Sequence, residues 1–178
     1  MSALGTFLRR DLCSKEHLVV LLHSQQFLRV VIAYLEQDYS TDTRLVSCHV
    51  IEHIVRFVGS VLDDEKIIVV RKSLQKWLDD NNDVVRLGIL SAISNFLSVA
   101  SSSSRNTDIK GFLNNLISHM DDPNEQIQEA VYAVNENYTS QRMELVLETV
   151  KSVRECHQNV KCDQLWELAT SIQRGFIQ

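Results

Sequence analysis

The chain has 178 residues with only one proline and five glycines, and its 23 acidic residues outnumber its 18 Lys and Arg, for a formal net charge of −5. So few turn-forming residues argue against an all-β sandwich or barrel and against a disordered linker protein, which leaves a helical fold. The acidic balance also weighs against nucleic acid as the main partner, because domains that grip phosphate backbones are usually basic.

The cysteines are scattered along the chain at Cys13, Cys48, Cys156 and Cys162, a distribution that does not predict a disulfide framework. The apolar runs near the N-terminus are too short to span a bilayer, and no secretory leader precedes them. We therefore expect a soluble cytoplasmic protein in a reducing compartment, without a membrane partner.

Residues 1–23 contain apolar side chains at spacings that predict one or two capping helices. These side chains are Leu4, Phe7, Leu8, Leu12, Leu18, Leu21 and Leu22. We expect this segment to close the N-terminal end of the helical fold that follows it.

An internal repeat begins after this segment. Three segments align without gaps from Phe27, Val69 and Gly111, so that their starts lie 42 residues apart. Apolar residues recur in the same columns, and an aspartate column runs through all three segments. Examples of these columns are Ile32, Leu74 and Leu116, then Val50, Ala92 and Val134, then Asp38, Asp80 and Asp122.

Each repeat reads as two helices joined by a short polar turn. In the first repeat Leu28, Val31, Ile32 and Leu35 form one apolar stripe at spacings of three and four. The turns are rich in Asp, Asn and Ser, which end one helix and cap the next. Pro123 lies in the third of these turns, where it interrupts neither helix.

The C-terminal part predicts a further, degenerate helix pair, from Met143 to Cys156 and from Cys162 to Gln173. The run Ser101–Ser104 predicts a solvated loop between the second and third repeats, with a phosphorylated segment as the alternative. The expected organisation is a cap at residues 1–23 and a repeat array over residues 24–178, divided into units 24–62, 63–104, 105–140 and 141–178.

A pair of helices of this length cannot bury its apolar stripe alone, and stacking successive pairs solves that problem. The turn from Trp77 to Gly88 resembles the HEAT consensus, in which an Asp-containing turn precedes Val-Arg at the start of the second helix. We therefore predict an all-α fold, an α-solenoid of about four HEAT-like (armadillo-type) antiparallel helix pairs.

Two clusters have residue types that could bind a metal. His49 and His53 share one helix face at a spacing that can hold zinc, but Glu52 stands in the wrong place for a metalloprotease base. The group Cys156, His157 and Cys162 does not have the spacing of a zinc knuckle. Solvent-facing histidines and buried cysteines are the favoured interpretation, so we expect no metal and no cofactor.

The sequence also shows no motif typical of an enzyme active site. The His-Glu dipeptides that bind iron in HEAT-type deoxyhypusine hydroxylases do not recur, since Glu16-His17 and Glu52-His53 have the reverse order. There is no nucleophile elbow and no glycine-rich phosphate loop. We therefore expect no catalytic residue.

A protein-binding surface is the functional prediction that the repeat favours. The second helices of such arrays usually form the concave wall, so their non-core columns are candidate contacts, with solvated helix faces as the alternative. The candidate residues are His49, His53, Arg56, Ser91, Asn95 and Ser98.

The later repeats and the tail resemble the C-terminal repeats of the dynein axonemal assembly factor 5 family. The resemblance rests on WLDDNNDVVRLGILSAISNFL, MDDPNEQIQEAV and VKSVRECHQNVKCDQLWEL. It implies a non-catalytic scaffold for cytoplasmic preassembly of axonemal dynein arms, with dynein intermediate or heavy chains, other assembly factors or chaperones as partners. The alternative is a HEAT-repeat adaptor of a transport or regulatory complex with other partners.

Overall fold

The computed structural model describes Glu16, Val20 and residues 25–36, 40–100, 106–155 and 159–175, and the regular structure of these residues is entirely helical. Apart from Glu16 and Val20, the predicted capping helices lie outside the described residues. So do the Ser101–Ser104 loop and the pair Cys156 and His157. The chain divides into two compact units, residues 1–99 and 100–178, which are described separately below.

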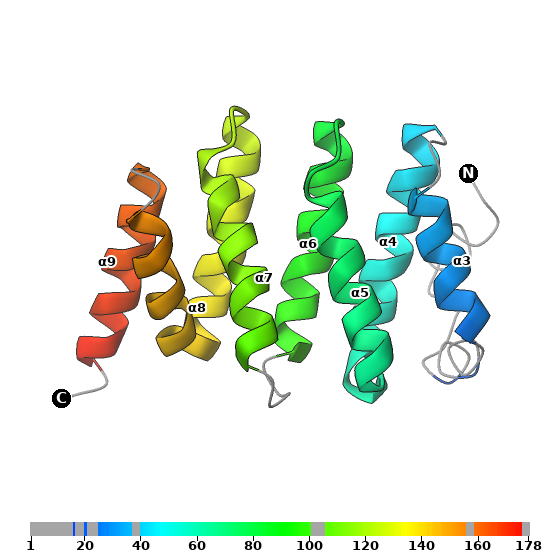
Figure 1. Ribbon diagram of the computed structural model, residues 1–178, viewed down its shortest axis with the longest axis horizontal. Coiled ribbons are helices and arrows are strands. Elements are labelled where there is room, and N and C mark those ends of the chain that lie inside the picture. Colours follow the sequence, from blue (N-terminus) through cyan, green and yellow to red (C-terminus); the bar gives the residue numbers. More distant parts are fainter. Residues whose placement is uncertain are drawn as a thin grey trace. The chain divides into compact units, whose positions relative to one another are not determined.

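From residue 25 on, the described part of the first unit forms two helix pairs (Figure 1). The first pair is α3 (Gln25–Glu36) and α4 (Thr41–Val58), followed by the 3₁₀ turn η1 (Gly59–Val61). The second pair is α5 (Asp64–Trp77) and α6 (Asp83–Ala100). The predicted stripes point into the core of this unit, where Leu28, Ile32, Val50, Leu74 and Ala92 are buried.

The second unit contains α7 (Asn106–Ser118), the 3₁₀ turn η2 (His119–Asp121), α8 (Glu125–Arg154) and α9 (Val160–Gly175). Helix α8 packs against both α7 and α9. It is kinked at Arg142, whose φ of −144° and ψ of 51° are not helical. Just before the kink, Asn135 and Thr139 each donate a side-chain hydrogen bond to the carbonyl four residues earlier, a contact that bends helices.

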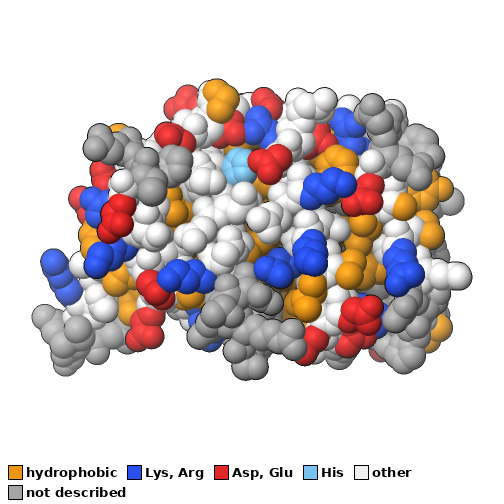
Figure 2. All heavy atoms as spheres, in the orientation of Figure 1, with side chains coloured by type: hydrophobic (Ala, Val, Ile, Leu, Met, Phe, Trp, Pro, Cys, Tyr) orange, Lys and Arg blue, Asp and Glu red, His pale blue; other side chains and the backbone are white. Residues whose placement is uncertain are grey.

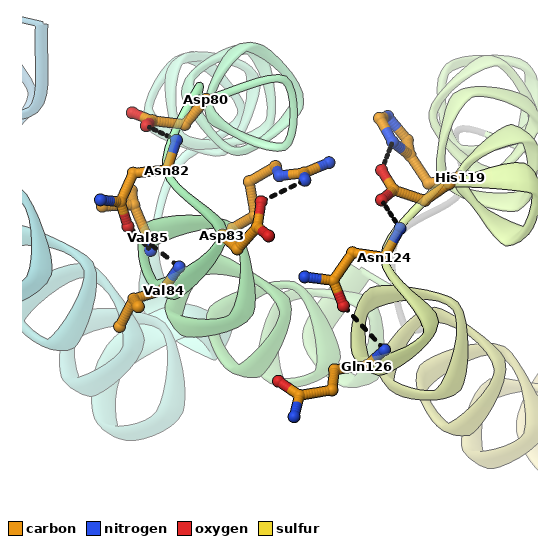
Figure 3. Close-up of polar contacts among 10 residues, drawn as sticks. Asp80, Asn82, Asp83, Val84, Val85, His119, Asn124 and Gln126 are labelled. Carbon is orange, nitrogen blue, oxygen red and sulfur yellow. Dashed lines mark hydrogen bonds and ion pairs between the residues drawn. The ribbon is translucent and has the colours of Figure 1, made fainter.

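The turn inside a helix pair has the same construction in both units (Figure 3). In the first unit Asp80 Oδ1 accepts a bond from Asn82 N at 2.8 Å, and Asn82 Oδ1 accepts one from Val84 N at 3.0 Å. In the second unit the bonds recur 42 residues later, from Asn124 N to Asp122 and from Gln126 N to Asn124, at 2.8 and 2.9 Å. Each Asp thus ends one helix and each Asn caps the next.

Contacts between residues about one repeat apart tie the two pairs of the first unit together. Arg44 Nε lies 3.3 Å from Asp80 Oδ2, and both side chains are buried. Asn82 Nδ2 donates to Thr41 Oγ1 at 3.4 Å. The turn of the second pair is therefore anchored to the start of α4, and the pairs stack side by side.

Among the described helices, α6 is long and apolar enough by length and composition to cross a membrane. It is also a central core helix, with Val85, Ile89, Ile93 and Leu97 almost fully buried within the unit. Packing against the rest of the unit accounts for its hydropathy.

The fold predicted from the repeat is confirmed: the described part of the chain is an all-α protein of packed antiparallel helices, the α-solenoid class. The boundaries drawn between the cap and the individual units remain predictions.

Candidate protein-binding face

Helices α4 and α6 approach one another closely at two glycines. Their exposed side chains therefore form one continuous surface, the α4–α6 face. A Cβ at Gly88 would lie 3.4 Å from Leu45 Cδ2 and 3.7 Å from Cys48 Cβ. A Cβ at Gly59, just after α4, would lie only 2.9 Å from Val99 Cγ2. The six predicted contact residues all lie on these two helices, within the first unit.

A polar cluster bridges the two helices at the middle of this surface. Ser91 Oγ of α6 donates to Glu52 Oε1 of α4 at 2.8 Å. His49 Nδ1 lies 3.5 Å from Glu52 Oε2, and the His49 side chain is 48% exposed. The Glu52 carboxylate therefore has partners on both sides, and His49 remains open to a further contact.

Farther along α4 an aromatic and basic cluster is partly exposed. The rings of His53 and Phe57 are parallel, with an interplanar angle of 1° and centroids 5.8 Å apart. The Arg56 guanidinium carbon lies 4.6 Å from the Phe57 ring centroid, close enough for a cation–π interaction. Phe57 is 36% exposed, so the cluster offers an apolar surface beside a cation.

The α6 side of the surface is polar and uncharged. Asn95 Nδ2 donates to the carbonyl of Ser91 at 3.0 Å, and Ser98 Oγ donates to that of Asn95 at 2.7 Å. No charged residue follows Arg86 before α6 ends. Mild polarity of this kind suits a protein contact, because it can be desolvated at lower cost than a row of charges.

The structure brings the six predicted residues onto adjacent helices, but their role in binding is still a prediction. Sequence reasoning missed Glu52 and Phe57. Phe57 follows His53 at a spacing of four, which puts both on one helix face, and this spacing was a usable signal. The bond from Ser91 to Glu52 had no local signal, because it depends on how closely α4 and α6 pack.

The described residues hold no group of three or more His, Cys, Asp or Glu side chains placed to bind a metal. Burial raises the pKa of the Cys48 thiol to about 12, with the nearby Asp80 carboxylate adding to the effect. Burial likewise raises the pKa of Cys162 to about 11. Both thiols are therefore protonated near neutral pH, a state that makes them weak ligands and nucleophiles.

The tail of the chain forms a groove of about 560 Å³ between the end of α8 and the start of α9. Arg154 Nε donates to Asp163 Oδ1 at 2.7 Å, and its guanidinium carbon lies 5.2 Å from the Trp166 ring centroid. Leu165, also on α9, is fully buried. Among the described tail residues that carry the family resemblance, Arg154 thus ties the end of α8 to α9.

Stacked helix pairs with an exposed polar and aromatic face define the class of this protein: an α-solenoid. No family model matches the chain. It is similar to dynein axonemal assembly factor 5 from Mus musculus, with 30% identity over 140 residues, which cover 76% of this chain and 16% of the relative. The Homo sapiens protein of that name is 29% identical over 140 residues, which again cover 76% of this chain and 16% of the relative.

The Xenopus laevis protein of the same name is 26% identical over 170 residues, covering 93% of this chain and 20% of the relative. The resemblance predicted from the sequence is therefore confirmed over most of the chain. The chain spans only 16 to 20% of the length of these curated relatives.

Proposed function

We propose that this chain is a non-catalytic, protein-binding scaffold that acts in the cytoplasmic preassembly of axonemal dynein arms. Its partners are dynein intermediate or heavy chains, together with other assembly factors or chaperones. The contact surface is the α4–α6 face, which carries the six residues predicted from the repeat as the concave wall, His49, His53, Arg56, Ser91, Asn95 and Ser98. No bond is made or broken in this role, because the protein acts by holding its partners in a productive arrangement.

The observation that carries this proposal is the similarity to dynein axonemal assembly factor 5 over 140 residues or more in three vertebrates. The face itself adds support, since Phe57, Arg56 and His49 offer an aromatic, a cation and a hydrogen-bonding group on α4, the helix that packs closely against α6. Aromatic and Arg side chains are the types that dominate protein–protein contacts.

A second candidate function is that of an adaptor in a transport or regulatory complex with unrelated cargo. The stacked helix pairs favour it equally, because a solenoid fixes a surface and not a partner. The two functions differ in which proteins bind the α4–α6 face.

Co-purification from cells that are building motile cilia tests the proposal. The tagged chain is expected to recover dynein heavy or intermediate chains, and Ser98→Arg is expected to reduce their recovery at least about tenfold by placing a bulky charge on the face. Ser171→Arg on α9 is the matched control, because both serines are exposed and donate to the carbonyl three residues earlier at 2.7 Å.

Absence of dynein chains from the wild-type eluate would refute the assembly role. If dynein chains are recovered equally with wild type and both variants, the assembly role stands but the α4–α6 face is the wrong surface. Recovery of a stoichiometric complex of unrelated proteins, lost in Ser98→Arg alone, would identify the adaptor function instead.

A further inference from the structure

A second exposed surface lies on the first helices of the two pairs in the first unit, away from the residues singled out above. On α3 it includes Arg29, Val30 and Tyr34, and the two apolar side chains are 50% and 49% exposed. On α5 it includes the exposed Lys72 and Lys76. Figure 2 shows basic side chains spread over α3 and α5 with hydrophobic ones between them.

Helices α3 and α5 are neighbours, so these side chains belong to one surface. Lys76 Nζ lies 3.0 Å from Glu36 Oε1, a contact that joins the last turn of each helix. In the 42-residue register Arg29 corresponds to Arg71, and Tyr34 corresponds to Lys76. The two helices therefore present matching positions side by side.

The charge of this α3–α5 face is positive. It carries four cations, Arg29, Arg71, Lys72 and Lys76, against two acidic residues, Glu36 on α3 and Glu65, which lies seven residues before Lys72 on the same side of α5. The acidic residues of α5 are confined to its first turn, at Asp64 and Glu65, where they stabilise the helix N-terminus. Because the chain as a whole has a charge of −5, the α3–α5 face is a local basic surface on an acidic protein.

We propose that the α3–α5 face binds an acidic segment of a partner protein, with an apolar side chain of that segment packed on Tyr34 and Val30. A short segment meets only the local cations, since charges are screened beyond about 8 Å at physiological salt. A long nucleic acid or an anionic membrane would also meet the acidic remainder of the chain, which favours a peptide as the occupant. This inference does not depend on the dynein-related proposal above.

The test measures binding of labelled amphipathic peptides by fluorescence anisotropy with the purified full chain. Each peptide has about 15 residues, roughly four helical turns, with a Leu stripe and either Glu or Lys at its polar positions. We expect the Glu peptide to bind at least about tenfold more tightly than the Lys peptide, and salt to weaken its binding.

The variants locate the site. Arg29→Glu combined with Lys72→Glu is expected to weaken the Glu peptide at least about tenfold, and Tyr34→Ala about fivefold. Lys151→Glu on α8 combined with Arg174→Glu on α9 makes the same total charge change at an exposed lysine and an exposed arginine, and this control is expected to leave affinity unchanged. Circular dichroism confirms that each variant is folded before binding is measured.

Equal binding of the two peptides, or equal affinity of the wild type and the double variant, would overturn the proposal. Polyuridylate or phosphatidylserine vesicles are tested as competing probes. If either one binds more tightly than the Glu peptide and is lost in the double variant, the face recognises phosphate and the peptide proposal is wrong.

Discussion

At the scale of single residues, the polar side chains of the turns do the most to set the fold. Asp80 and Asn82 terminate one helix and start the next through bonds to backbone N–H groups only two residues away. Such local bonds are readable from sequence, and for this reason the sequence predicts the second and third turns of the repeat at the places where the structure has them. Contacts between helices, such as the hydrogen bond from Ser91 to Glu52, cannot be predicted from the sequence, because they depend on how closely the helices pack.

Cys48 gives a prediction at this scale. Its pKa in the folded chain, about 12, lies above the ordinary value of 9.0, so the folded state keeps a proton that the unfolded state releases at alkaline pH. The free energy of unfolding is therefore expected to fall as the pH rises above about 9, and this loss continues toward the folded pKa.

Urea unfolding at about pH 7, 9 and 10 measures this effect. Cys48→Ala removes the thiol and is expected to flatten the decline, whereas Ser91→Ala leaves it unchanged because that side chain does not titrate. If Cys48→Ala loses stability with pH as steeply as the wild type, the account of the buried thiol is wrong.

At the scale of elements, the stacking of helix pairs depends on how closely α4 and α6 approach. The pattern of apolar columns in the sequence predicts which side of each helix is buried, and Val50, Ile54, Ala92 and Phe96 are indeed in the core. The sequence predicts that a new helix begins at Met143, whereas in the structure the two segments join as α8 with a kink at Arg142, where neither proline nor glycine stands. The apolar stripes of the C-terminal helix pair predict its buried side, and Val150 and Leu165 of these stripes are buried.

Alanine substitutions at two glycines of the α4–α6 contact test this packing, because they are expected to have different effects on the free energy of unfolding. Gly88→Ala is expected to be neutral or to stabilise by up to about 1 kcal/mol, because its Cβ finds ordinary contact distances and alanine favours the helix. Gly59→Ala is expected to destabilise by about 1–2 kcal/mol, since its Cβ would press on the stiff side chain of Val99.

Thermal or urea unfolding of the two variants checks this pair, and each serves as the control for the other. Combining Gly59→Ala with Val99→Ala relieves the collision and is expected to abolish the extra penalty of the glycine substitution. Equal effects of the two alanine substitutions would contradict the packing described for α4 and α6.

At the scale of the whole molecule, the proposed function depends on exposed surfaces of the helix pairs. The repeat predicts that such surfaces exist, because stacked helix pairs leave their outer sides exposed. It does not predict which side chains cluster on them, and Phe57 and Tyr34 emerge as exposed aromatic residues only in the folded units. The identity of a partner is a property of these clusters, so the repeat pattern alone could not supply it.

Replacement of the chain in ciliated cells tests the central claim most directly. After depletion, the amount of assembled axonemal dynein in cytoplasmic extracts is measured by sedimentation, with heavy and intermediate chains followed by immunoblotting. The account predicts that depletion shifts these chains out of the assembled fraction, that wild type and Ser171→Arg restore it, and that Ser98→Arg does not. Unchanged dynein assembly after complete depletion would contradict the proposed function.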